Sequence, residues 1–425
     1  MDKISVIIPI YNADKYIAFT MECLLKQKYT NFEVIAVNDR STDNTENVIL
    51  SYEPQFNDKG IQLILVNREC NGGLCAAINS GLEVANGDYL CFPDSDDELS
   101  ENYLLKMYEA LKNNPDKNWV RCNYSIVLEN ENREYDVILP QQSVYEDDFY
   151  DFISKYIAHN AWNMLIKKEY FLQTVGKSIY DSRLTQEWSI LLPLSFHSNY
   201  LRCDEKLYRY FIRNNAMSSW QDKDIESVIE HINDLENLNL YIIESLGSGN
   251  DERIITSKQA IKIYYHLLRY KKYKQNIVYK KEEETKSILF EEAGKYIGKA
   301  EIEIIDNPDI IVRIVFDKIL KGNIDNSAAS YREYSKMTSK GYGIVYDEGG
   351  SELIPVIENI YGKAIYTVSY KDFFERKREA TIVIALIQNS KTYGKTEETA
   401  KDEYQFIEYR SVRDSIRGWA ALNSI

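Results

Sequence analysis

Residues 4–12 read ISVIIPIYN, and this stretch decides the fold. An uninterrupted run of aliphatic and β-branched residues is typical of a strand that is buried on both faces of a sheet. The apolar run ends at Pro9, which predicts that a loop follows the strand.

The same pattern repeats outward from this strand. Further strands are predicted at 32–37, 61–66 and 88–92, and helical spacing of apolar residues is found at 14–27, from about 43, and from 71 to about 84. Strands that alternate with helices predict an α/β domain built around a mostly parallel sheet.

Length and composition set the limits of the interpretation. The chain has 425 residues, which allows two to four domains of about 100–200 residues each. Hydrophobic residues make up 44% and charged residues 28%, as in ordinary globular proteins. No apolar run of about 18 residues is present, so no transmembrane helix is expected.

Charge and cysteine content exclude other classes. The 51 basic and 66 acidic residues leave a net charge of −15, which argues against a nucleic-acid-binding protein. Six cysteines without a CxxC pair, and only four histidines, argue against a zinc site. Free thiols and the absence of a secretory signal predict a cytoplasmic protein. The basic and aromatic run YKKYK at 270–274 leaves open a peripheral contact with the inner face of the membrane.

The rest of the chain predicts two accessory regions. We expect a first domain at 1–220, in which two strands at 119–129 and 135–139 form a hairpin. A helical region follows at 221–335. Residues 336–425 are expected to form a small Rossmann-like α/β domain with a strand at 343–346, helices at 352–361 and 370–375, and strands at 364–368 and 381–386.

Polar residues follow each strand of the first domain. Tyr11 and Asn12 follow the first strand, Asp39 and Arg40 the second, Arg68 the third, and Asp94, Ser95, Asp96 and Asp97 the fourth. Ligands of open α/β sheets bind beyond the carboxyl ends of the strands. Carboxylates, an arginine and a helix that opens with Gly72 therefore predict a site for an anionic, metal-bridged nucleotide.

The run DSDD at 94–97 is the sharpest feature of this edge. Three carboxylates within four residues repel one another unless a cation lies among them. Hard oxygen ligands select Mg²⁺ or Mn²⁺, which commonly bridge carboxylates to phosphates. The alternative is that these residues cap the helix that follows.

These pieces together resemble glycosyltransferase family 2, the inverting enzymes of the GT-A fold. The matching stretches are SVIIPIYN at 5–12, VNDRSTD at 37–43, NGG at 71–73 with AINSG at 77–81, NGDYL at 86–90, and DSDD at 94–97. They cover about residues 3–115, and a weaker match continues to about 215.

The resemblance implies a role for each matching position. The implied donor-binding residues are Pro9, Tyr11, Asn12, Asp39, Arg68, Gly72, Asp94, Ser95 and Asp96. Pro9–Tyr11 and Asp39 would bind the base, most often uracil in this family. Asp96 would hold Mn²⁺ or Mg²⁺, with Asp97 as the alternate ligand.

Three departures from the family pattern concern the donor pocket. The usual VDDGS reads VNDRS at 37–41, so that Asn38 stands in place of an acid and Arg40 in place of a glycine. The usual Ala-Arg-Asn reads Ala-Ile-Asn at 77–79, so that a cation is missing, and Arg68 is the candidate to replace it.

Inverting transfer needs a general base that takes a proton from the acceptor hydroxyl. The family places an acidic residue at the start of a helix well after the DxD motif, and Glu187 in LTQEW at 184–188 fits that place. Asp181 is the second candidate. A helix cap by Thr185, with Glu187 as an ordinary first-turn residue, is the alternative.

Three further residues are candidates for acceptor contact, namely Trp188, Trp162 and His159, although each also fits a structural role. The acceptor is expected to be a hydroxyl of a glycan, such as a growing surface polysaccharide, or of a protein. Arg209 and Arg213 are candidates to approach the diphosphate, although surface ion pairs also explain them.

The expected function is therefore transfer of a sugar from a nucleotide-sugar donor, preferably a UDP-sugar. The non-enzymatic alternative is a degenerate transferase that serves as a binding or scaffold subunit. A sugar nucleotidyltransferase is disfavoured because it needs a glycine-rich basic loop after the first strand, where this chain has PIYN at 9–12.

Overall fold

The computed structural model describes residues 2–129, 133–139, 147–153, 160–213 and 224–296, single helical positions between 308 and 319, and the backbone of four strands between 352 and 409. The chain divides into two compact units, residues 1–249 and 250–425. Each unit is described by itself.

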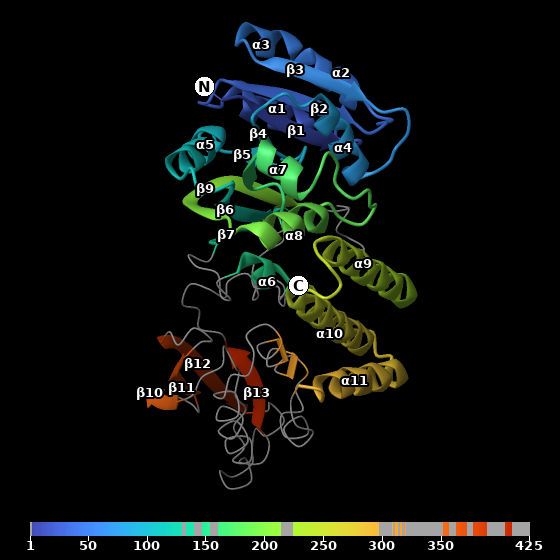
Figure 1. Ribbon diagram of the computed structural model, residues 1–425, viewed down its shortest axis with the longest axis vertical. Helices are drawn as coiled ribbons and strands as arrows, with labels where there is room; N and C mark the ends of the chain where they lie inside the picture. Colours follow the sequence, from blue (N-terminus) through green and yellow to red (C-terminus); the bar gives the residue numbers. More distant parts are fainter. Residues whose placement is uncertain are drawn as a thin grey trace. The chain divides into compact units, whose positions relative to one another are not determined.

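One mixed sheet organises the first unit (Figure 1). Its described strands are β1 (Ile4–Ile10), β2 (Phe32–Asn38), β3 (Gln62–Asn67), β4 (Tyr89–Cys91), β5 (Glu98–Leu99), β6 (Trp119–Leu128), β7 (Arg133–Val137), β8 (Met164–Lys167) and β9 (Leu201–Ile212). Their order is β3-β2-β1-β4-β8-β6-β9-β5, and β7 pairs with β6. β1 is parallel to β2 and β4, which confirms the predicted α/β core.

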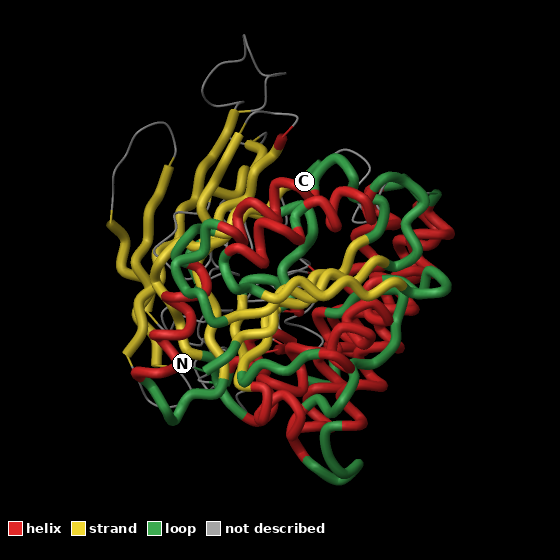
Figure 2. Tube along the Cα trace, turned by 90° about the horizontal axis from the view of Figure 1, so that it is seen from above, coloured by secondary structure: helices red, strands yellow, loops and turns green. Residues whose placement is uncertain are grey.

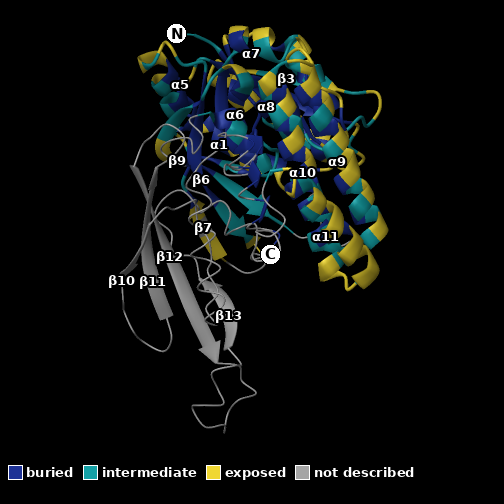
Figure 3. Cartoon of the chain, turned by 60° about the horizontal axis from the view of Figure 1, so that its bottom comes forward, coloured by how far each residue is buried: buried dark blue, intermediate teal, exposed yellow. Residues whose placement is uncertain are grey.

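Helices cover this sheet (Figure 2). They are α1 (Ile17–Leu25), α2 (Thr45–Ser51), α3 (Glu53–Asp58), α4 (Leu74–Val84), α5 (Tyr103–Asn113), α6 (Asp148–Ile153), α7 (Lys168–Thr174), α8 (Glu187–His197) and α9 (Ile225–Ser245). Every residue of β1 and β2 is buried, as expected for parallel strands with both faces covered, and Figure 3 shows the buried positions of the chain in dark blue.

α4 packs against β1 and β2 at a glycine. A Cβ atom at Gly81 would lie 2.4 Å from the side chain of Ile7 and 3.1 Å from that of Val37. Any larger residue at position 81 would push the helix away from the sheet. Gly81 therefore fixes the distance between α4 and the strands that end at the candidate site.

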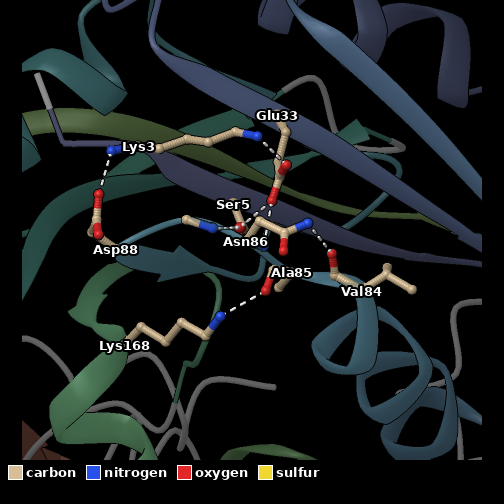
Figure 4. A network of polar contacts seen from close by, with 9 residues as sticks. Lys3, Ser5, Glu33, Val84, Ala85, Asn86, Asp88 and Lys168 are labelled. Atoms are coloured by element: carbon tan, nitrogen blue, oxygen red, sulfur yellow. Dashed lines mark hydrogen bonds and ion pairs between the residues drawn. The ribbon is translucent and has the colours of Figure 1, made fainter.

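A buried carboxylate, Glu33, ties together the amino ends of β1, β2 and β4 (Figure 4). It accepts hydrogen bonds from the Ser5 hydroxyl and from the Asn86 N–H, each 2.7 Å long, and from the Lys3 ammonium group. Burial alone would raise the pKa of Glu33, but these donors outweigh burial and hold it below its usual value. This network anchors the predicted turn at Asn86 and Gly87.

β9 is one long strand, although the sequence predicts two short ones at 200–203 and 207–212. The pairing of β9 with β6 shifts register between Cys122 and Tyr124, and this irregularity lets one strand continue past a break in the pattern. β9 also pairs with β5, with Glu98 opposite Arg209. The end of β9 is thereby brought beside residues 94–97.

The second unit contains the helices α10 (Glu252–Gln275) and α11 (Tyr279–Ala293) and a sheet of β10 (Glu352–Val356), β11 (Lys363–Lys371), β12 (Lys377–Gln388) and β13 (Tyr404–Tyr409). The two helices agree with the predicted helical region, and β11 and β12 with the predicted strands at 364–368 and 381–386. Within the described residues of the chain, no helix is long and apolar enough to cross a membrane.

The predicted Rossmann-like arrangement is wrong for the described strands of this unit, because all of them pair antiparallel in the order β10-β11-β12-β13. Residues 352–356 form a strand where a helix is predicted, and residues 370–371 belong to β11. β10 lies at the sheet edge, where a proline such as Pro355 is tolerated because one side of the strand makes no ladder bonds. The predicted strand at 343–346 lies outside the described residues.

Candidate active site

Three parallel strands end at the same level of the sheet. Ile10 is paired with Asn38, and Asn38 with Asn67. One residue beyond these strand ends, the Asp39 N–H donates to the carbonyl of Ile10 (2.8 Å), and the Arg68 N–H donates to the carbonyl of Asn38 (3.0 Å). The register therefore places Asp39 and Arg68 side by side at the carboxyl edge.

Asp39 is 2% exposed and faces the amino end of α4. Its carboxylate accepts hydrogen bonds from the N–H groups of Gly72 (3.0 Å) and Gly73 (2.7 Å) and pairs with the Arg68 guanidinium group. Gly73 has φ +87°, a conformation that side chains rarely adopt. A carboxylate has about four lone-pair sites, so three donors leave about one for a ligand. Arg68 is held in turn by Ser80, at 3.1 Å from its Nε atom.

Asn12 joins the loops that follow β1 and β2. Its N–H donates to the Ser41 hydroxyl (3.0 Å), and its Oδ1 atom accepts from the Thr42 N–H (2.8 Å). Beside it, Tyr11 is 50% exposed at the edge, while Pro9 is buried in β1. Asn12 therefore shapes the edge that Tyr11 presents to solvent.

Arg40 also lies at this edge. It is exposed and has φ +64°, at the position where the family pattern has glycine. The positive φ explains why glycine suits this position, and here the chain accepts a strained arginine.

The three aspartates after β4 have different environments. Asp97 is fully buried, and its two oxygens accept hydrogen bonds from the Tyr208 hydroxyl and from the Phe211 N–H, both 2.9 Å long. Burial raises the pKa of Asp97, and the charge of Asp96 raises it further. Asp97 as the alternate metal ligand stays a prediction, since its carboxylate is buried and already accepts these two hydrogen bonds.

Asp96 is more open and pairs with the end of β9. Its Oδ2 atom lies 2.7 Å from the Arg213 guanidinium group, and its side chain is 37% exposed. Burial raises the pKa of Asp96, and Arg213 opposes this effect. Arg213 itself is 9% exposed and packs over the rings of Tyr16 and Phe211.

Asp94 is the carboxylate that the protein leaves without a hydrogen-bond donor among the described residues. Burial raises the pKa of Asp94 well above its usual value, and the negative charges of Asp97, Asp96 and Glu187 raise it further. Its backbone N–H donates to the Tyr208 hydroxyl at 3.0 Å, which fixes the turn. A carboxylate that has no donor and lies beside other acids is stabilised by a cation.

The charge of Glu187 is the smallest of the causes that raise the pKa of Asp94, and it indicates that the two carboxylates lie near each other although they are 93 residues apart in the sequence. Glu187 is the first residue of α8, and its N–H donates to the Thr185 hydroxyl at 3.3 Å. The structure thus brings together the acids of the DxD motif and the predicted base. Asp181, the second candidate, is exposed in the loop before α8.

Tyr210 is a member of this site that sequence reasoning missed. Burial raises the pKa of its phenol, and the charges of Asp94, Asp97, Asp96 and Glu187 add to the effect. Its ring is stacked on that of Trp162, with centroids 5.1 Å apart. The run YRYFIR at 208–213 carries a signal for it, because Tyr208 and Tyr210 alternate with the arginines at the two-residue period of a strand.

The predicted acceptor residues are placed differently. Trp162 is 3% exposed, and its ring also stacks on that of Tyr208, with centroids 4.4 Å apart. It therefore packs behind the site as a buried support. Trp188 is 5% exposed, and His159 lies outside the described residues. Arg209 pairs with Glu98 and Glu134 and thus forms the expected surface ion pairs.

The carboxylate oxygens at this edge could supply some of the ligands of a divalent metal ion. Among the described residues, no group of three or more His, Cys, Asp or Glu side chains is arranged to hold a metal. Asp94 and Asp96 nevertheless offer hard oxygen ligands. Mg²⁺ and similar ions are commonly bound by one or two carboxylates together with substrate phosphates and water.

Comparison with known proteins agrees with this geometry. Residues 5–171 match the model of Glycosyl transferase family 2. Residues 5–171 therefore form a domain of glycosyltransferase family 2. The matched segment holds Asp39, Arg68 and the 94–97 run, whereas Glu187 and Arg213 lie beyond it.

Several curated bacterial proteins are similar to this chain. The glycosyltransferase GlyA of Streptococcus pneumoniae is 26% identical over 278 residues, which cover 62% of this chain and 38% of that protein. GlyG of the same species is 38% identical over 111 residues, which cover 26% of this chain and 36% of GlyG. The amylovoran biosynthesis glycosyltransferase AmsB of Erwinia amylovora is 37% identical over 119 residues, which cover 27% of this chain and 39% of AmsB. The chain thus spans less than half the length of these relatives.

A solved structure supports the fold. The chain is similar to residues 1–349 of TarS from S. aureus, crystallised with UDP-GlcNAc, with a TM-score of 0.52 and 16% identity. The match covers 82% of this chain and 95% of that one. At this identity the likeness concerns the fold, and it agrees with the GT-A architecture.

Proposed function

We propose that this protein is an inverting glycosyltransferase that moves a sugar from a nucleotide-sugar donor to a hydroxyl group of a glycan or protein. The observation that carries the proposal is the convergence of Asp94, Asp96 and Glu187 at the strand edge that also presents Asp39. These residues come from three separate segments of the chain, at 39, at 94–96 and at 187.

Each part of the edge has a distinct task in the proposal. Asp39 and the ring of Tyr11 bind the base, and the N–H groups of Gly72 and Gly73 orient Asp39. Uridine is the favoured nucleoside, because the similar TarS structure was solved with UDP-GlcNAc.

Asp94 and Asp96 are proposed to hold Mn²⁺ or Mg²⁺. When bound, such an ion offsets the negative charge of the nucleoside diphosphate. Binding would require Arg213 to share or release Asp96, to which it is paired at 2.7 Å.

Glu187 is proposed as the general base. The oxygen of the acceptor hydroxyl forms a bond to the anomeric carbon, and the proton of that hydroxyl passes to the Glu187 carboxylate. At the same time, the bond between the anomeric carbon and the diphosphate oxygen breaks. Attack from the face opposite the leaving group inverts the anomeric centre. Glu187 lies in the first turn of α8, where the helix dipole favours its charged carboxylate form.

A glycan is the favoured acceptor. AmsB is named for the biosynthesis of amylovoran, and it is 37% identical to this chain over the family 2 domain. The short overlap with the full length of AmsB leaves the sugar and the linkage to experiment.

The test is nucleotide release by the full chain from UDP-, GDP- and TDP-sugars, with Mn²⁺ or Mg²⁺ and with chelator. We expect slow hydrolysis of one donor that chelator abolishes and added metal restores. The absence of release, together with no metal-dependent nucleotide binding in a titration, would contradict the proposal and favour a binding or scaffold subunit.

A further inference from the structure

We propose that α4 fixes the position of Glu187 relative to the Asp39 pocket, and that Asn79 is the positioning residue through which it does so. The inference rests on the proposed role of Glu187 as the base. It concerns the loop at 175–186, which precedes α8, and the contacts that hold this loop.

Asn79 pairs with both polar groups of one residue in this loop. Its side-chain Nδ2 donates to the Ile179 carbonyl at 3.0 Å, and its Oδ1 accepts from the Ile179 N–H at 2.8 Å. The two residues are 100 positions apart in the chain. A primary amide is suited to this pair of hydrogen bonds, because it carries a donor and an acceptor side by side.

Two more contacts link α4 and the segment just before it to the same loop. An Arg183 N–H donates to the Asn71 carbonyl at 3.1 Å, and the Cys75 thiol lies 3.5 Å from the Thr185 carbonyl. Cys75 and Asn79 are one turn apart on one side of α4. Three points of attachment therefore hold the loop as far as Thr185, whose hydroxyl accepts the hydrogen bond from the Glu187 N–H.

The other end of this attachment is the donor pocket. Gly72 and Gly73, at the start of α4, donate their N–H groups to Asp39, and Gly81 sets the helix against the sheet. One rigid element thus reaches both the residue that binds the base and the loop that leads to the proton acceptor.

These contacts matter for function because they set the distance between Glu187 and the acceptor hydroxyl. A general base acts only within hydrogen-bond reach of the proton that it removes, and supporting hydrogen bonds keep it there. Loss of the Asn79 bonds would free the loop while leaving the Asp39 pocket in place. Transfer should suffer, and nucleotide binding should not.

The test compares Asn79→Ala with Asn47→Ala in the full chain. Asn47 is an exposed asparagine of α2 whose side chain donates to Asn44, so this variant controls for the substitution itself. Hydrogen exchange of the peptide over 176–186 is measured with and without UDP and Mn²⁺. The dissociation constant of UDP and the kcat of transfer are measured in parallel.

We expect the 176–186 peptide of Asn79→Ala to exchange at least about fivefold faster, since two hydrogen bonds of ordinary strength are lost. Peptides of β1 and β2 should be unchanged. Transfer kcat should fall by about tenfold or more, while the UDP dissociation constant stays within about twofold. Asn79→Asp keeps the bond from the Ile179 N–H but sets a carboxylate oxygen against the Ile179 carbonyl, so its 176–186 peptide should also exchange faster than that of the wild type.

Unchanged exchange of the 176–186 peptide would overturn the attachment, and faster exchange with unchanged kcat would overturn the positioning role. If Asn79→Ala does not fold, Arg183→Ala carries the test, because that side chain is exposed and its loss opens no cavity. The exchange measurement does not depend on the identity of the base. A failure of Glu187 as the base is therefore distinguishable from a failure of this proposal.

Discussion

Glu187 is the residue on which the proposed chemistry depends, and an isosteric amide removes only its ability to take a proton. We expect Glu187→Gln to lower transfer kcat by about 10²- to 10⁴-fold, the usual contribution of a general base. The dissociation constant of the nucleotide should be unchanged. The measurement is steady-state transfer once a donor and an acceptor are known.

Glu169→Gln is the matched control for this substitution. Glu169 lies in the first turn of α7, as Glu187 does in that of α8, and it is exposed. The control should keep full activity. Equal activity of both variants would exclude Glu187 as the base.

Asp96 and Asp97 are neighbours with opposite expected effects. Asp97→Ala leaves the buried Tyr208 hydroxyl and the Phe211 N–H without their acceptor, so the free energy of unfolding should fall by about 2–4 kcal/mol. Asp96→Ala removes a partly exposed ion pair and should cost about 1 kcal/mol or less, yet abolish metal-dependent nucleotide release.

Urea denaturation of the two variants, followed by the release assay, separates these roles. The opposite ranking, with Asp96→Ala the less stable and Asp97→Ala the less active, would show that the roles of the two residues are exchanged.

At the scale of elements, the network around Glu33 joins the amino ends of three strands and predicts a dependence of stability on pH. The pKa of Glu33 is lower in the folded state than in the unfolded chain, where it is about 4.3. The contribution of Glu33 to stability is therefore fully present above about pH 4.3, and it is lost as the pH falls through the pKa of Glu33 in the folded state. Glu33→Gln should lower the free energy of unfolding by about 1–3 kcal/mol at pH 7.

The difference between the wild type and Glu33→Gln should shrink as the pH falls below about 4. Urea denaturation at pH 7 and at pH 3.5 measures both values. Glu83→Gln, an exposed substitution on α4, is the control. A difference that grows toward acid would contradict the lowered pKa.

At the scale of the whole molecule, the division into residues 1–249 and 250–425 raises the question of which part each reaction step needs. α9 packs against α8 in the first unit, and Tyr241 of α9 contacts the ring of Tyr180 at 4.7 Å. A chain cut at residue 249 keeps this packing, whereas a cut at 221 removes α9.

We expect residues 1–249 to fold and to release nucleotide from the donor at a rate similar to that of the full chain. Residues 1–221 should melt at least about 5 °C lower, because the apolar face of α9 no longer covers α8. Thermal melting and the release assay decide this. Equal melting temperatures for the two shortened chains would show that α9 adds no stability.

We further propose that the second unit sets acceptor choice. Transfer to acceptor should then be lost in residues 1–249, although nucleotide release is retained. Full transfer activity and unchanged acceptor selectivity in the shortened chain would contradict this role.

The sequence by itself determined the α/β core, the positions of its strand ends and the family, because these depend on local signals such as buried apolar runs and short polar motifs. It also pointed to Glu187. Only the tertiary structure decided that Asp97 is held by Tyr208 and Phe211, that Arg213 pairs with Asp96, and that Asn79 holds residue 179. These contacts join residues about 100 positions apart, and their partners follow from the pairing of β9 and the placement of α4. The antiparallel second sheet was missed for the same reason, since strand direction depends on distant partners and not on the strand's own residues.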